Sequence, residues 1–138
     1  MLKLPLALEH ELEKEFKFTH KHYNEAALLH TWSEGRILIA PLPPYRQGSV
    51  ELYLNKALKS TAESIVLLLP CDVSTDWFNR IWGLALHAPC RVQMRFFNGR
   101  IKYEGENNQY RISSCLVVIR NAAIESQPNP SEQCERTA

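Results

Sequence analysis

The sequence lacks most of the features that assign a protein to a specialised class by composition. Its formal net charge is only +1, so no overall electric field draws the chain to nucleic acid or to a membrane surface. No apolar run is long enough to span a bilayer, and the N-terminal segment MLKLPLALEHELEKEF becomes charged too early for a signal peptide. These absences predict a cytoplasmic protein without a membrane partner, in which any nucleic-acid surface is a local patch.

Cysteine is scarce and is not arranged for metal binding. No two cysteines form a CxxC pair, which argues against a zinc ribbon. Three of the four stand in or beside hydrophobic segments, so we expect free, buried thiols in a reducing cytoplasm. Cys71 beside Asp72 suggests a nucleophile, but no histidine is close in sequence, and we expect a spectator thiol. The cysteines are Cys71, Cys90, Cys115 and Cys134.

The histidines invite a metal-binding interpretation that their spacing does not support. His20 and His22 are two positions apart, which suits one face of a strand, but no cysteine or aspartate accompanies them closely. A metal site needs several converging ligands. We therefore expect surface histidines and no metal at His10, His20, His22 and His30.

The length of 138 residues fits one domain that can bury a sizeable core. We expect this α/β domain to cover residues 1–121. Beyond Asn121 the chain is rich in Pro, Ser, Glu and Gln and has no hydrophobic periodicity. The segment 122–138 is therefore predicted to be a flexible C-terminal tail.

The stretch from Arg36 to Tyr45, RILIAPLPPY, predicts a buried strand that leads into a stiff loop. Its unbroken apolar run is typical of a strand covered on both faces. Proline cannot donate to a sheet ladder, so the strand should end near Ala40, and Pro43 and Pro44 should restrict the loop. Ligands bind beyond the carboxyl ends of strands in open α/β sheets, which makes Tyr45 a candidate site residue.

Periodic patterns predict the elements around this strand. Leu8, Leu12 and Phe16, each four residues apart, indicate an amphipathic helix after Pro5. A helix capped by Ser49 should run to about Thr61, and 64–69 is a second buried strand. Strand, helix and strand in this order predict a right-handed unit with a parallel strand pair. The segment 70–73 then emerges at the same edge of the sheet as the proline-rich loop.

The second half predicts a further helix and antiparallel strands. Ser74 or Thr75 should cap a helix whose apolar residues belong mostly to the core. The alternating segment 90–96, an Asn-Gly turn signal and the segment 101–103 predict a hairpin, and 115–119 is the last strand. The expected fold is α/β, with a mostly parallel sheet, helices on both faces and a C-terminal antiparallel hairpin. The helix residues are Trp77, Phe78, Ile81, Trp82 and Ala85.

Basic and aromatic residues alternate through the predicted hairpin region. Such a mixture suits a single-stranded or flipped nucleotide, because the cations meet phosphate and the rings stack on bases. Glu104 and Glu106 dilute the charge, and an ordinary solvated hairpin is the alternative. Arg46 in the proline-rich loop can likewise contact a phosphate or remain a solvated charge. The residues of the mixture are Arg91, Arg95, Phe96, Phe97, Arg100, Lys102, Tyr103, Tyr110 and Arg111.

The order of these motifs resembles the phage-type DNA N6-adenine methyltransferases. Those proteins carry a strand ending in NPPY or DPPY, a helix, and a strand with a pattern close to LLPxxTxTxWF, as in RILIAPLPPY and SIVLLLPCDVSTDWF here. FNGRIKY is similar to the family's GRIKF-like segment, and SSCLVVI to its late hydrophobic strand. The resemblance covers roughly Phe16 to Arg120. It implies a Rossmann-like methyltransferase fold, S-adenosylmethionine as cofactor and DNA as partner.

The resemblance also implies roles for individual residues. In the family the base is flipped out, the first side chain of NPPY and a backbone carbonyl accept the two N6 hydrogens, and the tyrosine stacks on the base. Pro43, Pro44 and Tyr45 match, but Leu42 stands where the Asn or Asp should be. Leucine accepts no hydrogen bond, and losing one preorganised polar group costs about 3 kcal/mol, roughly a hundredfold or more in rate.

The implied cofactor region departs from the family as well. The family has a strand ending in an Asp-Pro-Cys-like motif near here, so the resemblance places Phe18, Thr19 and Pro43 at the cofactor, without the usual acid. Ala26 and Ala27 replace the acid and glycine of a stretch resembling EDDGLxxxW. The resulting hypothesis is a degenerate methyltransferase domain that retains the fold, with weak or absent methylation.

Three other interpretations remain open. The first is an active DNA adenine methyltransferase with unusual motifs. The second is a catalytically silent nucleic-acid binder, whose salt-dependent binding would be weakened by Arg95→Ala or Arg100→Ala. The third is a protein-interaction module of phage or mobile-element origin that acts on a host protein. The predicted nucleic-acid contacts are Arg46, Arg95, Arg100 and Lys102.

Overall fold

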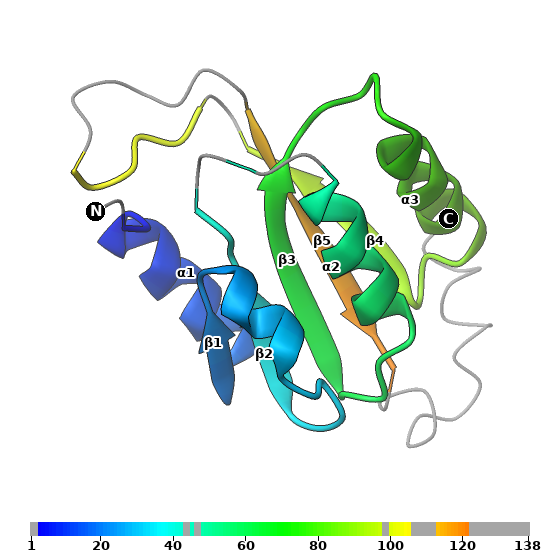
Figure 1. Ribbon diagram of the computed structural model, residues 1–138, viewed down its shortest axis with the longest axis horizontal. Helices are drawn as coiled ribbons and strands as arrows, with labels where there is room; N and C mark the ends of the chain where they lie inside the picture. Colours follow the sequence, from blue (N-terminus) through cyan, green and yellow to red (C-terminus); the bar gives the residue numbers. More distant parts are fainter. Residues whose placement is uncertain (1–2, 43–44, 46–47, 98–99, 106–112, 122–138) are drawn as a thin grey trace.

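The computed structural model describes residues 3–42, 45, 48–97, 100–105 and 113–121. Over these residues the chain forms an α/β fold with helices on both faces of one sheet (Figure 1). The predicted boundary near residue 121 and the predicted tail 122–138 fall largely outside the described residues. In chain order the elements are α1 (Leu6–Phe16), β1 (His20–His22), the 3₁₀ helix η1 (Glu25–Leu29), β2 (Arg36–Ile39), α2 (Ser49–Leu58), β3 (Ser64–Pro70), α3 (Asp76–His87), β4 (Val92–Phe96) and β5 (Ser114–Arg120).

The sheet has five strands in the order β1-β2-β3-β5-β4. β1, β2 and β3 are parallel neighbours, whereas β5 pairs antiparallel with both β3 and β4. The α/β class is confirmed, but the expectation of a mostly parallel sheet needs correction, because the four pairings comprise two parallel and two antiparallel ones. The unit β2-α2-β3 has the predicted parallel arrangement, with Ile37 opposite Ile65.

The start and end of α2 differ in detail from the prediction. Gly48, at φ +80°, precedes the helix, and Ser49 is its first residue rather than its cap. The helix ends at Leu58, not near Thr61, because the side chains that follow take other partners. The Ser60 hydroxyl donates to the Trp32 carbonyl, and the Thr61 hydroxyl donates to the Ser33 carbonyl at 2.9 Å. These bonds attach the end of α2 to the segment before β2.

The predicted hairpin between 90–96 and 101–103 is wrong. β4 pairs instead with β5, with Phe96 opposite Cys115, and residues 101–103 belong to no strand. The turn residues Asn98 and Gly99 lie outside the described residues. Ile101 and Tyr103 are buried against the α1 side of the sheet, at 7% and 1% exposure. Burial of these two side chains favours this arrangement over pairing with β4, since a large buried side chain contributes about 1.5–3 kcal/mol.

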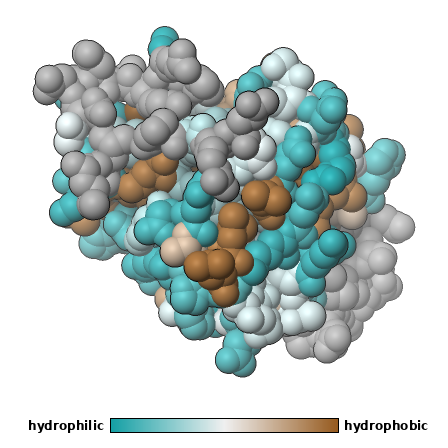
Figure 2. Space-filling view, in the orientation of Figure 1, coloured by the Kyte–Doolittle hydropathy of each residue, from teal (hydrophilic) through white to brown (hydrophobic). Residues whose placement is uncertain are grey.

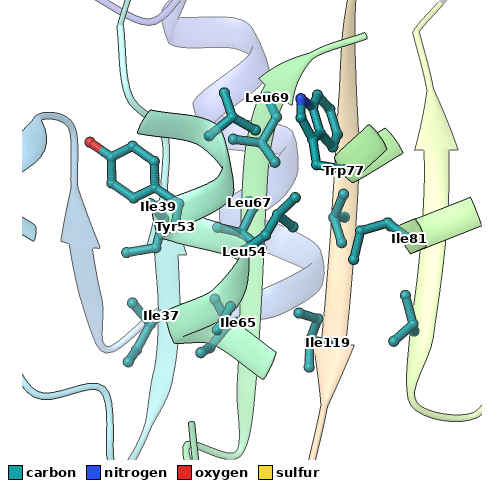
Figure 3. Close-up of a cluster of buried hydrophobic side chains, with 14 of the residues drawn as sticks. Ile37, Ile39, Tyr53, Leu54, Ile65, Leu67, Leu69, Trp77, Ile81 and Ile119 are labelled. Atoms are coloured by element: carbon teal, nitrogen blue, oxygen red, sulfur yellow. The ribbon is translucent and has the colours of Figure 1, made fainter. Parts of the chain in front are cut away.

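Alternate residues of the central strands supply two cores, one on each face. The face covered by α2 and α3 takes Ile37 and Ile39 from β2 together with Ile65, Leu67 and Leu69 from β3 (Figure 3). The opposite face, covered by α1, takes Leu38, Ala40, Val66 and Leu68 with Leu12 and Phe16 of the helix. This alternation confirms the predicted helices on both faces, and it explains the unbroken apolar runs in the sequence.

Helix α3 buries only part of its predicted apolar stripe. Trp77, Phe78 and Ile81 are buried, as predicted for most of the stripe, whereas Trp82 is 45% exposed. Trp82 lies over the outermost strand, where no further strand or helix among the described residues covers it. Hydrophobic surface remains visible on the face that carries α2 and α3 (Figure 2).

Three other predictions from the sequence concerned membrane spans, free cysteines and metal ligands. No helix in the described ranges is long and apolar enough to cross a membrane. Cys71 and Cys115 are free, but Cys90 is disulfide-bonded, so the prediction of a free thiol at that position is wrong. Among the residues that the structure describes, no group of three or more His, Cys, Asp or Glu side chains converges as a metal site.

Candidate functional site at the carboxyl edge of the sheet

β2 and β3 end at the same edge of the sheet, and β5 begins there. Ala40 follows β2, Cys71 follows β3, and the Cys71 amide donates to the Ser113 carbonyl at 2.7 Å. Ser114, opposite Pro70, is 2% exposed, and its hydroxyl has no hydrogen-bond partner among the described residues. A buried hydroxyl without a partner is rare, because it has lost water without compensation. Sequence reasoning missed Ser114, whose only signal was its position beside the last strand.

Tyr45 reaches this edge from the proline-rich loop and contacts a buried tyrosine. Its hydroxyl lies 3.3 Å from the hydroxyl of Tyr103. Tyr103 is 1% exposed, and Glu104, the next residue, forms a two-way backbone bridge with Lys3 at 2.9 and 3.1 Å. Tyr103 is thus a fixed support for the Tyr45 hydroxyl. The sequence grouped Tyr103 with a hairpin and gave no sign of this contact.

Leu42 is partly buried against the apolar cluster beneath α1. Its side chain therefore contributes to packing and supplies no hydrogen-bond acceptor at the edge. An asparagine or aspartate in the same orientation would bury a polar group among Leu4, Leu38 and other apolar side chains of that cluster. Pro43, Pro44 and Arg46 lie outside the described residues.

Phe18 and Thr19, two of the three residues predicted to bind S-adenosylmethionine, are not at this edge, and the third, Pro43, lies outside the described residues. Thr19 is at the opposite, amino end of the parallel strands, where its amide donates to the Arg36 carbonyl at 2.7 Å. Its hydroxyl accepts a hydrogen bond from the Arg36 amide at 2.9 Å. Phe18 stacks on Phe16 at 5.7 Å between ring centroids. The length of β2, about 10 Å at the usual rise per residue, separates Thr19 from Ala40.

The carboxyl end of β1 leads into Tyr23 and Asn24, and Glu25 follows as the first residue of η1. The Tyr23 hydroxyl donates to the Glu9 carboxylate, and the Asn24 side-chain oxygen accepts from the Ala26 amide at 2.9 Å. These groups satisfy one another within the protein. The assignment of Phe18 and Thr19 to a cofactor site therefore stays a prediction.

Two histidines meet beside this edge. The rings of His22 and His30 stack at 5.0 Å between centroids. Burial lowers the pKa of His22, and the neighbouring His30 and His20 lower it further. The pair is a titratable feature but offers too few ligands for a structural metal site.

The His22 pKa predicts a pH dependence of stability. Because its pKa is lower in the folded than in the unfolded chain, where it is about 6.5, the unfolded chain binds more protons as the pH falls. The stabilisation is therefore present above about pH 6.5 and is lost as the pH falls below it. We expect urea denaturation to show a smaller loss of stability between about pH 7.5 and 5.5 for His22→Gln than for the unmodified protein. Equal losses would contradict the prediction.

The thiols at the edge are poor nucleophiles. Burial raises the pKa of Cys71, with the Asp72 carboxylate adding to the rise, and burial raises the pKa of Cys115 to about 12. Both thiols are therefore protonated at neutral pH, whereas a nucleophilic cysteine needs a thiolate. The edge offers aromatic stacking and hydroxyl hydrogen bonds, but the described residues supply no nucleophile with an adjacent base.

The predicted basic residues are only partly brought together. Arg95 forms a two-pronged ion pair with Glu15 at 2.7 and 2.5 Å, and its guanidinium lies 5.3 Å from the Phe16 ring centroid. The hydrogen bond from Arg95 lowers the pKa of Glu15. Arg95 is on the outermost strand, about 14 Å from β2 at normal strand spacing. Arg100 and Lys102 are exposed on the segment that carries Tyr103.

The Glu15 pairing allows a test of Arg95 as a phosphate contact. If Arg95 meets phosphate, Glu15→Gln should tighten binding of a single-stranded oligonucleotide about threefold at low salt, because a competing carboxylate is removed. Glu11→Gln is the matched control, since Glu11 is on the same helix and pairs only loosely with Lys14 at 3.7 Å. Fluorescence anisotropy measures both affinities. The same gain for both variants would assign the effect to net charge and exclude a role for Arg95.

Comparison with known proteins adds no assignment. No family model matches the chain, and no curated protein matches it. The edge built by Leu42, Tyr45, Tyr103 and Ser114 is therefore the basis for assigning a function.

Proposed function

We propose that the chain is a degenerate methyltransferase domain, similar in plan to the S-adenosylmethionine-dependent DNA adenine-N6 methyltransferases, with weak or absent catalysis. The observation that carries the proposal is Tyr45, which follows β2 at the carboxyl edge and has its hydroxyl beside Tyr103. The order of strand, loop with Tyr45, helix and strand is the order that the resemblance implies. DNA as the partner and the cytoplasm as the location belong to the same proposal.

The chemistry available to this chain favours base binding over methyl transfer. An extruded or unpaired base can stack on the Tyr45 ring, and stacking on an aromatic side chain contributes about 1–3 kcal/mol. The adenine amino group would then face Leu42, which accepts no hydrogen bond from N6. Without that acceptor the N6 lone pair stays delocalised into the ring, and the amino group is a poor nucleophile. The loss corresponds to about 3 kcal/mol of transition-state stabilisation.

The position of Thr19 supports the same conclusion. Thr19, one of the predicted cofactor residues, is held at the opposite end of β1 by bonds to Arg36, so it supplies no cofactor contact at the edge. A catalytically silent nucleic-acid binder is accordingly the second candidate. A protein-interaction module is the third, and the exposed Trp82 and Phe96 favour it.

Calorimetric titration with S-adenosylmethionine separates these candidates. We expect no binding at millimolar ligand to protein that circular dichroism shows to be folded. Binding of single-stranded DNA, measured in parallel over a range of salt concentrations, should persist without the cofactor and weaken with salt.

Two other outcomes would change the assignment. Micromolar binding of S-adenosylmethionine would favour an active enzyme, and Leu42→Asn would then be assayed for a gain of methyl transfer to DNA. If neither S-adenosylmethionine nor single-stranded DNA binds, the result would contradict the proposed function and favour the protein-interaction module.

A further inference from the structure

The outer edge of the sheet at β4 is open among the described residues. β4 is the last strand in the sheet order, and its strand partner is β5. One row of its backbone N–H and C=O groups therefore faces away from the sheet, and in that row the Val92 amide already donates to the Ala88 carbonyl at 3.0 Å. Such an edge is a template for another strand, and proteins usually protect it with charge, proline or a covering element.

An aromatic patch lies beside this edge. The rings of Phe78, Trp82 and Phe96 lie 6.2–6.4 Å apart between centroids, joining α3 to the end of β4. Trp82 is 45% exposed, Phe96 52%, and Leu86, one turn further along α3, 63%. Figure 1 shows α3 running alongside β4 at this end of the sheet. Single exposed apolar residues are ordinary, but a group of them beside an open edge indicates an interaction surface.

We propose that a second copy of this chain occupies the edge, with β4 pairing antiparallel with β4 of the partner about a two-fold axis at Met94. This register pairs all five residues of the strand. On the face of α3, Val92 then stands opposite the partner's Phe96, so apolar side chains meet. On the face of α1, Gln93 stands opposite the partner's Arg95. The two-fold axis repeats each of these pairs at a second, symmetric position in the interface.

The Gln93–Arg95 pair is chemically complementary. Within one protomer the Arg95 Nε already donates to the Gln93 side-chain oxygen at 3.0 Å, and two further nitrogens bind Glu15. A guanidinium carries five N–H groups, so donors remain for the oxygen of the partner's Gln93. Cross-strand pairs of this kind are the units that stabilise a sheet.

Two neighbouring registers also keep the residues of each sheet face opposite residues of the same face. Both are less favourable than the register centred on Met94. An axis at Arg95 would place Arg95 directly opposite the partner's Arg95. An axis at Gln93 would place Arg95 opposite the partner's Arg91 and would leave Phe96 unpaired. Like charges directly opposite in a sheet are destabilising. The sequence of β4 therefore selects the register centred on Met94.

The proposal is tested by the oligomeric state of the full chain in solution. Sedimentation velocity over a wide concentration range should show a reversible monomer–dimer equilibrium. Gln93→Lys places a second cation opposite the partner's Arg95 at two symmetric positions, and it should raise the dimer dissociation constant about tenfold or more. The matched Gln93→Glu places an anion there and should leave the dimer intact or tighten it.

Gln93 is exposed, so neither substitution disturbs the core, and thermal melts should show both variants folded. A monomer at every concentration would overturn the proposal and would leave the edge to an extended peptide of another protein. A dimer that responds equally to Gln93→Lys and Gln93→Glu would overturn the β4 pairing. Failure of DNA binding would not affect either result, since the edge at β4 is separate from Tyr45.

Discussion

Replacing Gly35 with alanine is expected to lower the free energy of unfolding by about 3 kcal/mol, from backbone strain and a lost hydrogen bond. Gly35 has φ +85°, a conformation that side chains with a Cβ rarely adopt. An added Cβ would also overlap the Thr19 hydroxyl. That hydroxyl accepts from the Arg36 amide at 2.9 Å and donates to the Arg36 carbonyl at 3.1 Å. The substitution therefore strains the turn and breaks the attachment of Thr19 to β2.

Gly48→Ala is the matched control for this prediction. Gly48 has nearly the same φ, +80°, but no atom of the described residues lies within 4 Å of the position that its Cβ would take. Only the conformational penalty applies there, and the expected loss is about 1 kcal/mol. Urea denaturation followed by circular dichroism measures both changes. Equal losses at the two glycines would show that the contact with Thr19 contributes nothing.

Tyr45→Ala is expected to weaken binding of a single-stranded oligonucleotide about 10- to 100-fold, because it removes the ring on which a base would stack. Tyr103→Phe keeps a buried ring but removes the hydroxyl that lies 3.3 Å from the Tyr45 hydroxyl. We expect it to weaken binding only about threefold, through a less well positioned Tyr45. Fluorescence anisotropy at low salt measures both affinities on protein shown to be folded.

Phe96→Ala provides the comparison for Tyr45→Ala. Phe96 is an exposed ring at the far side of the sheet, in the region whose basic and aromatic residues predicted a nucleotide surface. Wild-type affinity for Tyr45→Ala together with a large loss for Phe96→Ala would move the binding surface from the β2 loop to β4. It would contradict the function proposed for Tyr45.

The elements with strong local patterns were predictable from the sequence. The three α-helices and the strands β2, β3 and β5 follow the predicted positions closely, because apolar periodicity and proline placement act within a few residues. The unbroken runs ILI and IVLLL required burial on both faces, and the two cores supply it. The exit of the proline-rich loop at the carboxyl edge followed from the direction of β2.

The tertiary structure alone decided which distant segments compete for the same partners. β5 displaced residues 101–103 as the partner of β4, and Tyr103 was buried beneath α1 and placed beside Tyr45. Glu15 forms an ion pair with Arg95, which lies 80 positions further along the chain. Arg36 holds Thr19 at the amino end of β1, away from the candidate site. Local pattern states whether a side chain should be buried or a backbone extended. Which residue or strand it contacts is determined by burial and strand pairing across the whole chain, and no short stretch of sequence encodes this.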